Sequence, residues 1–339
     1  MTLRLLFASA LFAFQLPAAQ GIPTPGPATG SPYAPQSIVA GGIVMPLYPP
    51  DSPFLKKERI TEPEVYNMQA SVPGRIQSIV NIHNPSIEMH PVDKGINTGT
   101  LVILVPGGGH NTLNVGSEGA DFVPFFYNYG VNTAILRNRL RKDGYDAQTD
   151  AVYDAQQAIR VVRAHATELG VDPHKIGIVG FSAGAELAAP SALQYDAFDT
   201  AHGGTDPLAG VSSRPDFVGL IYPGPTPFAR DPKTAVPQDA PPTFIACAGS
   251  GDAQHAIWAE DYFHAFLVAH VPNIEMHIYG NGVHGNGMKA RNGEPFGTWH
   301  ERFIDWFRDL GFLQKPGLET KAAKDVAAYA AQRRTGQKS

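Results

Sequence analysis

The pentapeptide G-F-S-A-G at residues 180–184 constrains the fold of this chain more than any other segment. The mostly apolar residues 175–179 before it are typical of a buried strand, and residues 185–189 after it are typical of a helix. Between a strand and a helix, G-x-S-x-G makes a sharp turn that lifts the serine hydroxyl above the sheet edge. Glycines flank the serine because side chains there would collide across so tight a turn. The segment predicts a nucleophilic serine, Ser182.

Strand and helix patterns alternate along the chain around this turn. Apolar runs of strand length occupy residues 100–106, 131–136, 175–179, 217–222, 243–248 and 274–279. Helical spacing or helix-forming composition occupies residues 118–129, 149–169, 182–195, 257–269 and 299–310. Alternation of this kind predicts a mostly parallel sheet covered by helices on both faces. Residues 38–44 and 77–82 are expected to add antiparallel edge strands.

The 339 residues divide into four segments. Residues 1–21 have the basic start, short apolar run and small residues of a signal peptide, although the cleavage position stays open. Residues 22–36 are proline-rich and predict a disordered tether. Residues 37–312 predict one α/β domain, and the polar residues 313–339 a frayed helix or disordered tail. The apolar run is too short for an ordinary membrane span. We therefore expect export to the periplasm or the outside, with no stable membrane association after cleavage.

Composition excludes several classes of function. The net charge is −5 and no long basic run precedes the tail, which argues against nucleic acid as a partner. Cys247, the one cysteine, lies in an apolar run and predicts a buried thiol without a disulfide. The histidines lack metal-site spacing, so we expect no metal and no cofactor. The oligomeric state is not indicated.

Two residues at predicted strand ends complete a candidate catalytic triad with Ser182. A serine hydroxyl needs a base, and the base needs an acid that orients it. Enzymes with this strand–turn–helix serine place the acid and then the histidine after it in the chain. Asp252 follows the strand at 243–248, and His284 follows the strand at 274–279. Parallel sheets place their sites at these strand ends.

Each assignment has an alternative. Asp252 at the start of a helix is also the pattern of a helix cap, and His284 between glycines is also that of an exposed loop histidine. Asp261 is a weaker rival acid because it lies within the helix. His255 is close to Asp252 but is disfavoured as the base by the chain order. Glu186 fits a structural role at a helix N-terminus better than a catalytic one.

A tetrahedral intermediate needs hydrogen-bond donors aimed at its oxyanion. One predicted donor is the backbone amide of Ala183, directly after the serine. The others are the amides of Gly108 and Gly109, in the G-G-G run that follows the strand at 100–106. A phosphate-binding loop is the alternative, but the run lacks the G-x-G-x-x-G pattern and the P-loop lysine. His110 either borders this pocket or lies at the surface.

Several short motifs occur in one order along residues 82–312. They are V-P-G-G-G at 105–109, E-G at 118–119, R-L at 139–140, G-F-S-A-G at 180–184, R-P-D-F at 214–217, L-I-Y-P at 220–223 and the closing W-to-F helix at 306–312. With Asp252 and His284 at the acid and base positions, the segment resembles the α/β-hydrolase esterases related to acetyl xylan esterases and feruloyl esterases, the BD-FAE-like group.

The resemblance implies an α/β-hydrolase fold and ester hydrolysis through an acyl-enzyme, often on acylated plant polysaccharides or their fragments. It implies a small-molecule or carbohydrate ester as substrate. Ala185-Glu186 and Ser250-Gly251 depart from the group's pattern beside the pocket, which bears on substrate choice. Tyr222 and the proline-rich 223–240 loop are expected pocket walls. A serine exopeptidase on the same fold, or a non-catalytic binding protein, remain the alternatives.

Overall fold

The computed structural model describes residues 33–195, 197–202, 206–285, 287–288 and 293–336. The predicted signal peptide and most of the predicted tether lie outside these ranges. At the end of the predicted tether, the buried Tyr33 donates its backbone amide to the carbonyl of Ile60 at 2.8 Å, so this end contacts the domain. No helix within the described ranges is both long enough and apolar enough to cross a membrane.

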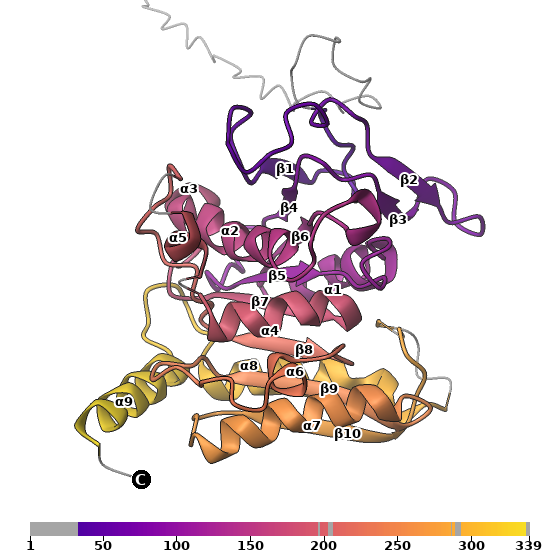
Figure 1. The fold of residues 1–339 in the computed structure, drawn as a ribbon. Coiled ribbons are helices and arrows are strands. Elements are labelled where there is room, and N and C mark those ends of the chain that lie inside the picture. Colours follow the sequence, from indigo (N-terminus) through magenta and orange to yellow (C-terminus); the bar gives the residue numbers. More distant parts are fainter. Residues whose placement is uncertain (1–32, 196, 203–205, 286, 289–292, 337–339) are drawn as a thin grey trace, which may run out of the picture.

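A central sheet of eight strands organises the described residues (Figure 1). In spatial order the strands are β1 Ile43–Pro46, β4 Ser86–His90, β6 Asn132–Arg137, β5 Leu101–Val105, β7 Ile176–Phe181, β8 Val218–Ile221, β9 Thr243–Ser250 and β10 Glu275–Asn281. β4 pairs antiparallel with both β1 and β6, and all other neighbours are parallel. The residues of β5 to β8 are buried on both faces, which explains their continuous apolar runs.

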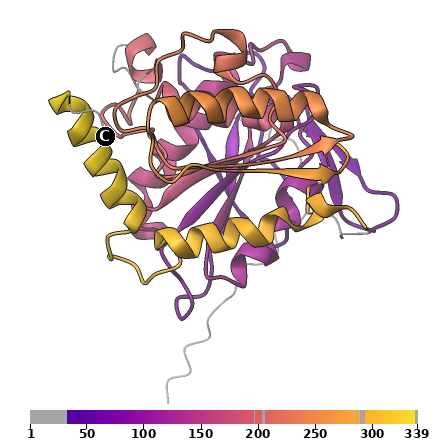
Figure 2. The same ribbon diagram turned by 90° about the horizontal axis from the view of Figure 1, so that it is seen from below.

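Helices cover both faces of this sheet, as the alternation predicts. On one face lie α2 Asp150–Ala164, α4 Ala185–Leu193 and α7 Ala253–Val268; on the other lie α1 Phe122–Tyr127 and α8 Trp299–Leu310. Figure 2 shows α7 and α8 on opposite sides of the strands. Strand residues alternate between the two cores. In β5, Ile103 packs toward α2 and α4, whereas Val102 and Leu104 pack toward α1 and α8.

Several smaller elements complete the structure. They are β2 Val65–Met68, β3 Ile76–Val80, α3 Ala166–Leu169, α5 Ala197–His202, α6 Pro227–Arg230 and α9 Lys321–Thr335, with the single turns η1 Gly116–Ala120, η2 Arg141–Asp143, η3 Ser182–Gly184 and η4 Pro295–Thr298. The helix expected over 149–169 is divided at His165 into α2 and α3, and the helix expected over 118–129 begins with the π turn η1.

The edge-strand prediction for residues 77–82 is wrong. β3 pairs with β2 in a separate two-stranded sheet, and β1 forms the antiparallel edge through β4. The left-handed backbone of Asn81, with φ of 61°, turns the chain away after β3. The chain then enters β4, a buried strand. This strand was not predicted from the sequence, because three of its five residues, Ser86, Glu88 and His90, are polar.

For the C-terminal segment, a frayed helix or a disordered tail was expected; the structure has a helix, α9, that packs on the domain. Its buried residues Ala322, Val326, Tyr329 and Ala330 lie on one helical face. The side chain of Thr320 caps the helix by accepting from the amide of Ala323 at 3.0 Å. α9 lies beside one end of the central sheet (Figures 1 and 2). The apolar stripe is present in the sequence, but the alanine-rich composition obscures it.

A buried ion pair joins the antiparallel strands at the N-terminal half. Glu88 of β4 and Arg137 of β6 are fully buried, with Nη2 and Oε2 2.5 Å apart. Glu88 also accepts from the backbone amides of Ile38 at 2.6 Å and Val39 at 2.9 Å. One carboxylate therefore fixes the chain that enters the domain to the sheet.

We predict that Glu88→Gln lowers the free energy of unfolding by about 3 kcal/mol or more. The reason is that Arg137 would stay charged and buried but would lose the negative charge of Glu88 beside it. Urea denaturation followed by far-UV circular dichroism measures this loss. Asp305→Asn, which breaks the exposed pair between Asp305 and Arg308, is the matched control and should cost less than about 1 kcal/mol. Equal small losses in both variants would contradict the role assigned to Glu88.

Candidate active site

The strand β7 ends in the turn that presents Ser182. Ser182 has a left-handed backbone, with φ of 52°, which is strained for a residue with a side chain. The turn leaves no room at Gly184, where an added Cβ atom would lie 2.0 Å from the carbonyl oxygen of Val105. The glycine thus lets the elbow pack directly on the end of β5. The result is a serine hydroxyl at the carboxyl edge of the sheet.

The structure brings the three predicted triad residues together. The hydroxyl of Ser182 lies 2.7 Å from Nε2 of His284, and Nδ1 of His284 lies 2.9 Å from Oδ2 of Asp252. An ionised carboxylate only accepts hydrogen bonds, so Nδ1 of His284 carries the proton and Nε2 accepts from the serine. This is the tautomer that a general base facing a serine needs.

Asp252 occupies the N-cap position of α7, as the alternative interpretation of the sequence expects. Its side chain makes no capping hydrogen bond. The carboxylate is instead turned toward the imidazole of His284, and Asp252 as a residue is 8% exposed. Helix capping therefore does not account for where this side chain points.

The predicted oxyanion donors line the same cavity as the triad serine. Gly108, Gly109 and Ala183 border a cavity of about 470 Å³ together with Ser182 and His284. Gly108 has φ of 129°, and a Cβ atom there would lie 2.2 Å from the carbonyl oxygen of Thr112. The neighbouring amide, that of Gly107, is already donated to Glu118 at 2.7 Å. This contact leaves the next two amides of the loop as the candidate donors.

Glu118 links the candidate oxyanion loop to the histidine loop. Its Oε2 accepts from the amide of Gly107, and its Oε1 accepts from the hydroxyl of Tyr222 at 2.7 Å. The Tyr222 oxygen in turn accepts from the amide of Gly287, three residues after His284, at 3.0 Å. The Tyr222 ring packs edge-on against His284, with ring centroids 5.0 Å apart. Two loops that are distant in sequence are thus tied to one buried carboxylate.

In the sequence, Glu118 stands out only as part of the E-G pair, and Tyr222 only as part of the L-I-Y-P motif and as an expected pocket wall. The sequence feature that could have indicated a buried role for Glu118 is its place as an acidic residue among glycines and mostly small or apolar residues. Burial raises the pKa of Glu118, although the hydrogen bonds from Tyr222 and Gly107 oppose the shift. The net direction shows that desolvation outweighs these two neutral donors.

His255, which the chain order disfavours as the base, shares the triad carboxylate. Its Nδ1 lies 2.5 Å from Oδ1 of Asp252, and its ring stacks on His284 with centroids 3.8 Å apart. Asp252, His255 and His284 are also the one group in the described part of the chain whose ligand atoms lie close enough, within 4.8 Å, to share a metal ion. The hydrogen bonds among them already account for the arrangement.

The remaining candidates take structural positions. Glu186 lines the cavity and forms an ion pair with Arg230 of α6. His110 is buried rather than at the surface, with Nε2 3.5 Å from a carboxylate oxygen of Glu186. Cys247 is buried in β9, and burial raises the pKa of its thiol to about 12, so it is not a thiolate at neutral pH.

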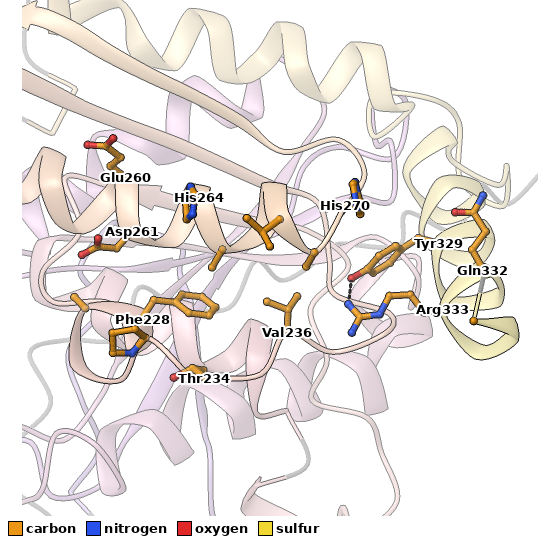
Figure 3. Close-up of a pocket in the computed structure, with 16 residues that line it drawn as sticks. Phe228, Thr234, Val236, Glu260, Asp261, His264, His270, Tyr329, Gln332 and Arg333 are labelled. Carbon is orange, nitrogen blue, oxygen red and sulfur yellow. Dashed lines mark hydrogen bonds between the residues drawn. The ribbon is translucent and has the colours of Figure 1, made fainter. Parts of the chain in front are cut away.

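A larger cavity of about 870 Å³ lies elsewhere, between α6, α7 and α9 (Figure 3). Apolar side chains such as Phe228 and Val236 line it, and Arg333 donates to the Tyr329 hydroxyl at 2.7 Å at one end. Asp261, the rival acid, faces this groove from α7. None of the triad residues borders it, so the smaller cavity is the candidate active site.

We predict that the Glu118 carboxyl makes stability depend on pH in one direction. The pKa of Glu118 is raised in the folded state, so over a range of pH the folded protein keeps a proton that the unfolded chain releases. The contribution of Glu118 to the free energy of unfolding is therefore lost as the pH rises through the raised pKa. The stability of wild type relative to Glu118→Gln should therefore fall as the pH is raised from about 4, the ordinary pKa of a glutamate, into the neutral range. Urea denaturation of both proteins across this range measures the difference, and a pH-independent difference would contradict the prediction.

Comparison with known proteins supports the fold and the local resemblance. The BD-FAE family model matches residues 89–211, which include Gly108, Glu118 and Ser182. Endo-1,4-beta-xylanase B of Butyrivibrio fibrisolvens is 27% identical over 168 residues, 49% of this chain and 24% of the relative. Acetylxylan esterase of Xylanibacter ruminicola is 28% identical over 126 residues, 37% of this chain and 23% of the relative. The matched segment thus spans about a quarter of each curated relative.

Among solved structures, the acetyl ester-xyloside bifunctional hydrolase of Caldicellulosiruptor lactoaceticus superimposes with a TM-score of 0.61 at 24% identity, over 82% of this chain and 99% of that one. Esterase Est2 of Thermogutta terrifontis, bound to propionate, gives 0.53 at 23% identity, over 70% and 93%. At these identities the likeness establishes the fold. The predicted fold class is confirmed: the chain has the α/β-hydrolase fold, residues 89–211 match the BD-FAE family model, and 126 residues of the chain are similar to an acetylxylan esterase.

Proposed function

We propose that this chain is a serine hydrolase that cleaves carboxylic esters through an acyl-enzyme. The observation that carries the proposal is the continuous hydrogen-bond chain from Ser182 through His284 to Asp252 at the edge of a cavity. The BD-FAE match over residues 89–211, which include Ser182, and the similarity to an acetylxylan esterase support the same reaction class. Nothing in this chemistry requires a cofactor.

In the first half-reaction, the Ser182 oxygen attacks the ester carbonyl while Nε2 of His284 takes the hydroxyl proton. Asp252 holds the imidazole in the productive tautomer and stabilises its charged form. The amides of Gly108, Gly109 and Ala183 donate to the oxyanion of the tetrahedral intermediate. Collapse of this intermediate breaks the ester C–O bond, and protonated His284 gives its proton to the departing alcohol.

In the second half-reaction, water replaces the alcohol. His284 takes a proton from the water as its oxygen attacks the acyl carbonyl on Ser182. The second tetrahedral intermediate collapses, the carboxylic acid leaves, and the proton returns from His284 to the serine oxygen. The exposed position of His284 gives water direct access to this step.

We propose acylated carbohydrates, as acetyl or feruloyl esters, as the substrate class. The names of two relatives, an endo-xylanase and an acetylxylan esterase, support this choice. Trp258 and Pro225 line the same cavity as Ser182, and an aromatic ring and a proline offer apolar surface against which a sugar ring or an aromatic acyl group can pack. We further propose that residues 1–21 direct export, so that the enzyme meets such esters outside the cytoplasm.

We predict that Ser182→Ala loses at least about a thousandfold in kcat/KM on p-nitrophenyl acetate, because no other group can form the acyl-enzyme. Ser71→Ala, at an exposed serine in the loop between β2 and β3, is the matched control and should keep full activity. The same assay with p-nitrophenyl butyrate and octanoate, methyl ferulate and acetylated xylo-oligosaccharides compares the acyl groups and alcohols.

Retention of activity in Ser182→Ala would contradict the serine mechanism. Wild-type turnover of aryl esters but of neither the ferulate nor the acetylated oligosaccharides would contradict the carbohydrate proposal alone. No turnover on any of these esters would favour the exopeptidase or the non-catalytic binding protein.

A further inference from the structure

The triad carboxylate has two imidazole partners. Oδ2 of Asp252 faces Nδ1 of His284 at 2.9 Å, and Oδ1 faces Nδ1 of His255 at 2.5 Å. The two rings lie nearly parallel, with an interplanar angle of 22° and centroids 3.8 Å apart. The triad mechanism uses only one of these imidazoles, so the second one needs its own explanation.

His255 is placed as a neutral donor to the carboxylate. Because ionised Asp252 can only accept, Nδ1 of His255 carries the proton in this contact. Burial and the neighbouring His284 lower the pKa of His255, which favours the uncharged ring, while Asp252 and Glu186 act in the opposite direction. The ring also packs nearly perpendicular to the ring of Trp258, with centroids 5.1 Å apart, so packing restrains its orientation.

We propose, on the basis of the proposed ester hydrolysis, that His255 is a positioning residue that fixes Asp252 and His284 and allows His284 to act as the base at lower pH. Its N–H holds the carboxylate oxygen that does not face His284, which sets the plane of the carboxylate. Its ring covers one face of His284, which restricts rotation of the base away from Ser182.

The effect on pH follows from the shared carboxylate. A second hydrogen bond to Asp252 stabilises its negative charge and weakens its attraction for protonated His284. The imidazole is therefore free to accept the serine proton at lower pH than it would be beside an unshared carboxylate. The other acidic groups near this pair are Glu186, beside His255, and Glu118, behind Tyr222. They are unchanged in variants at residue 255.

Two substitutions separate the hydrogen bond from the stacking. His255→Phe keeps a ring over His284 and removes the donor, whereas His255→Asn places an amide N–H near the position of Nδ1 and removes the ring. His255→Ala removes both the donor and the ring, and its small side chain introduces no steric clash. His264→Phe, at an exposed position on the same helix, is the matched control.

The measurement is the pH profile of kcat/KM for p-nitrophenyl acetate. We predict that the midpoint of the acidic limb rises by roughly one pH unit in His255→Phe and His255→Ala and returns toward wild type in His255→Asn. The plateau should fall by about tenfold in His255→Ala and His255→Asn, where the ring no longer restrains the base. His264→Phe should match wild type in both quantities.

An unshifted midpoint in both donor-lacking variants, whatever the plateau, would overturn the proposal and reduce His255 to a wall of the cavity. Failure of the proposed function looks different, because wild type itself would then show no turnover that depends on Ser182.

Discussion

The left-handed turn at Ser182 is the constraint on which the site depends. A non-glycine residue in this conformation costs about 1–3 kcal/mol, so the surroundings must hold it. β7 supplies that support, because it is buried between β5 and β8 and runs straight into the turn. Gly184 packs the far side of the turn against the end of β5. The serine is thereby fixed at the sheet edge where the loops after β5, β9 and β10 converge.

Two buried carboxylates then arrange the rest of the site around the serine. Glu118 accepts from neutral donors, the Gly107 amide and the Tyr222 hydroxyl, and so couples the candidate oxyanion loop to the histidine loop. Asp252 accepts from two imidazoles and couples the start of α7 to the loop after β10. Each carboxylate has both oxygens engaged, which is how a buried acidic group is accommodated in an apolar surrounding.

Much of this could be predicted from the sequence, and the rest fails for physical reasons. The sheet could be predicted because buried parallel strands are continuous apolar runs. The three triad residues could be predicted because each follows a predicted strand and they occur in the order serine, acid, histidine. The Glu118–Tyr222 contact joins residues 104 positions apart, and no local pattern records such a pairing. The second imidazole on Asp252 depends on side-chain direction at the first turn of α7. The buried residues of α9 have helical spacing in the sequence, but many of the exposed residues between them are also alanine, so the apolar face does not stand out.

Covalent modification tests most directly whether Ser182 is an activated nucleophile. Intact-mass spectrometry after incubation with a fluorophosphonate, followed by peptide mapping, reports whether one serine is activated as a nucleophile. We predict a single adduct on the peptide that contains Ser182, and no adduct when the protein is unfolded before the incubation, since reactivity requires His284 and Asp252 in place. An unmodified protein, or an adduct on another residue, would contradict it.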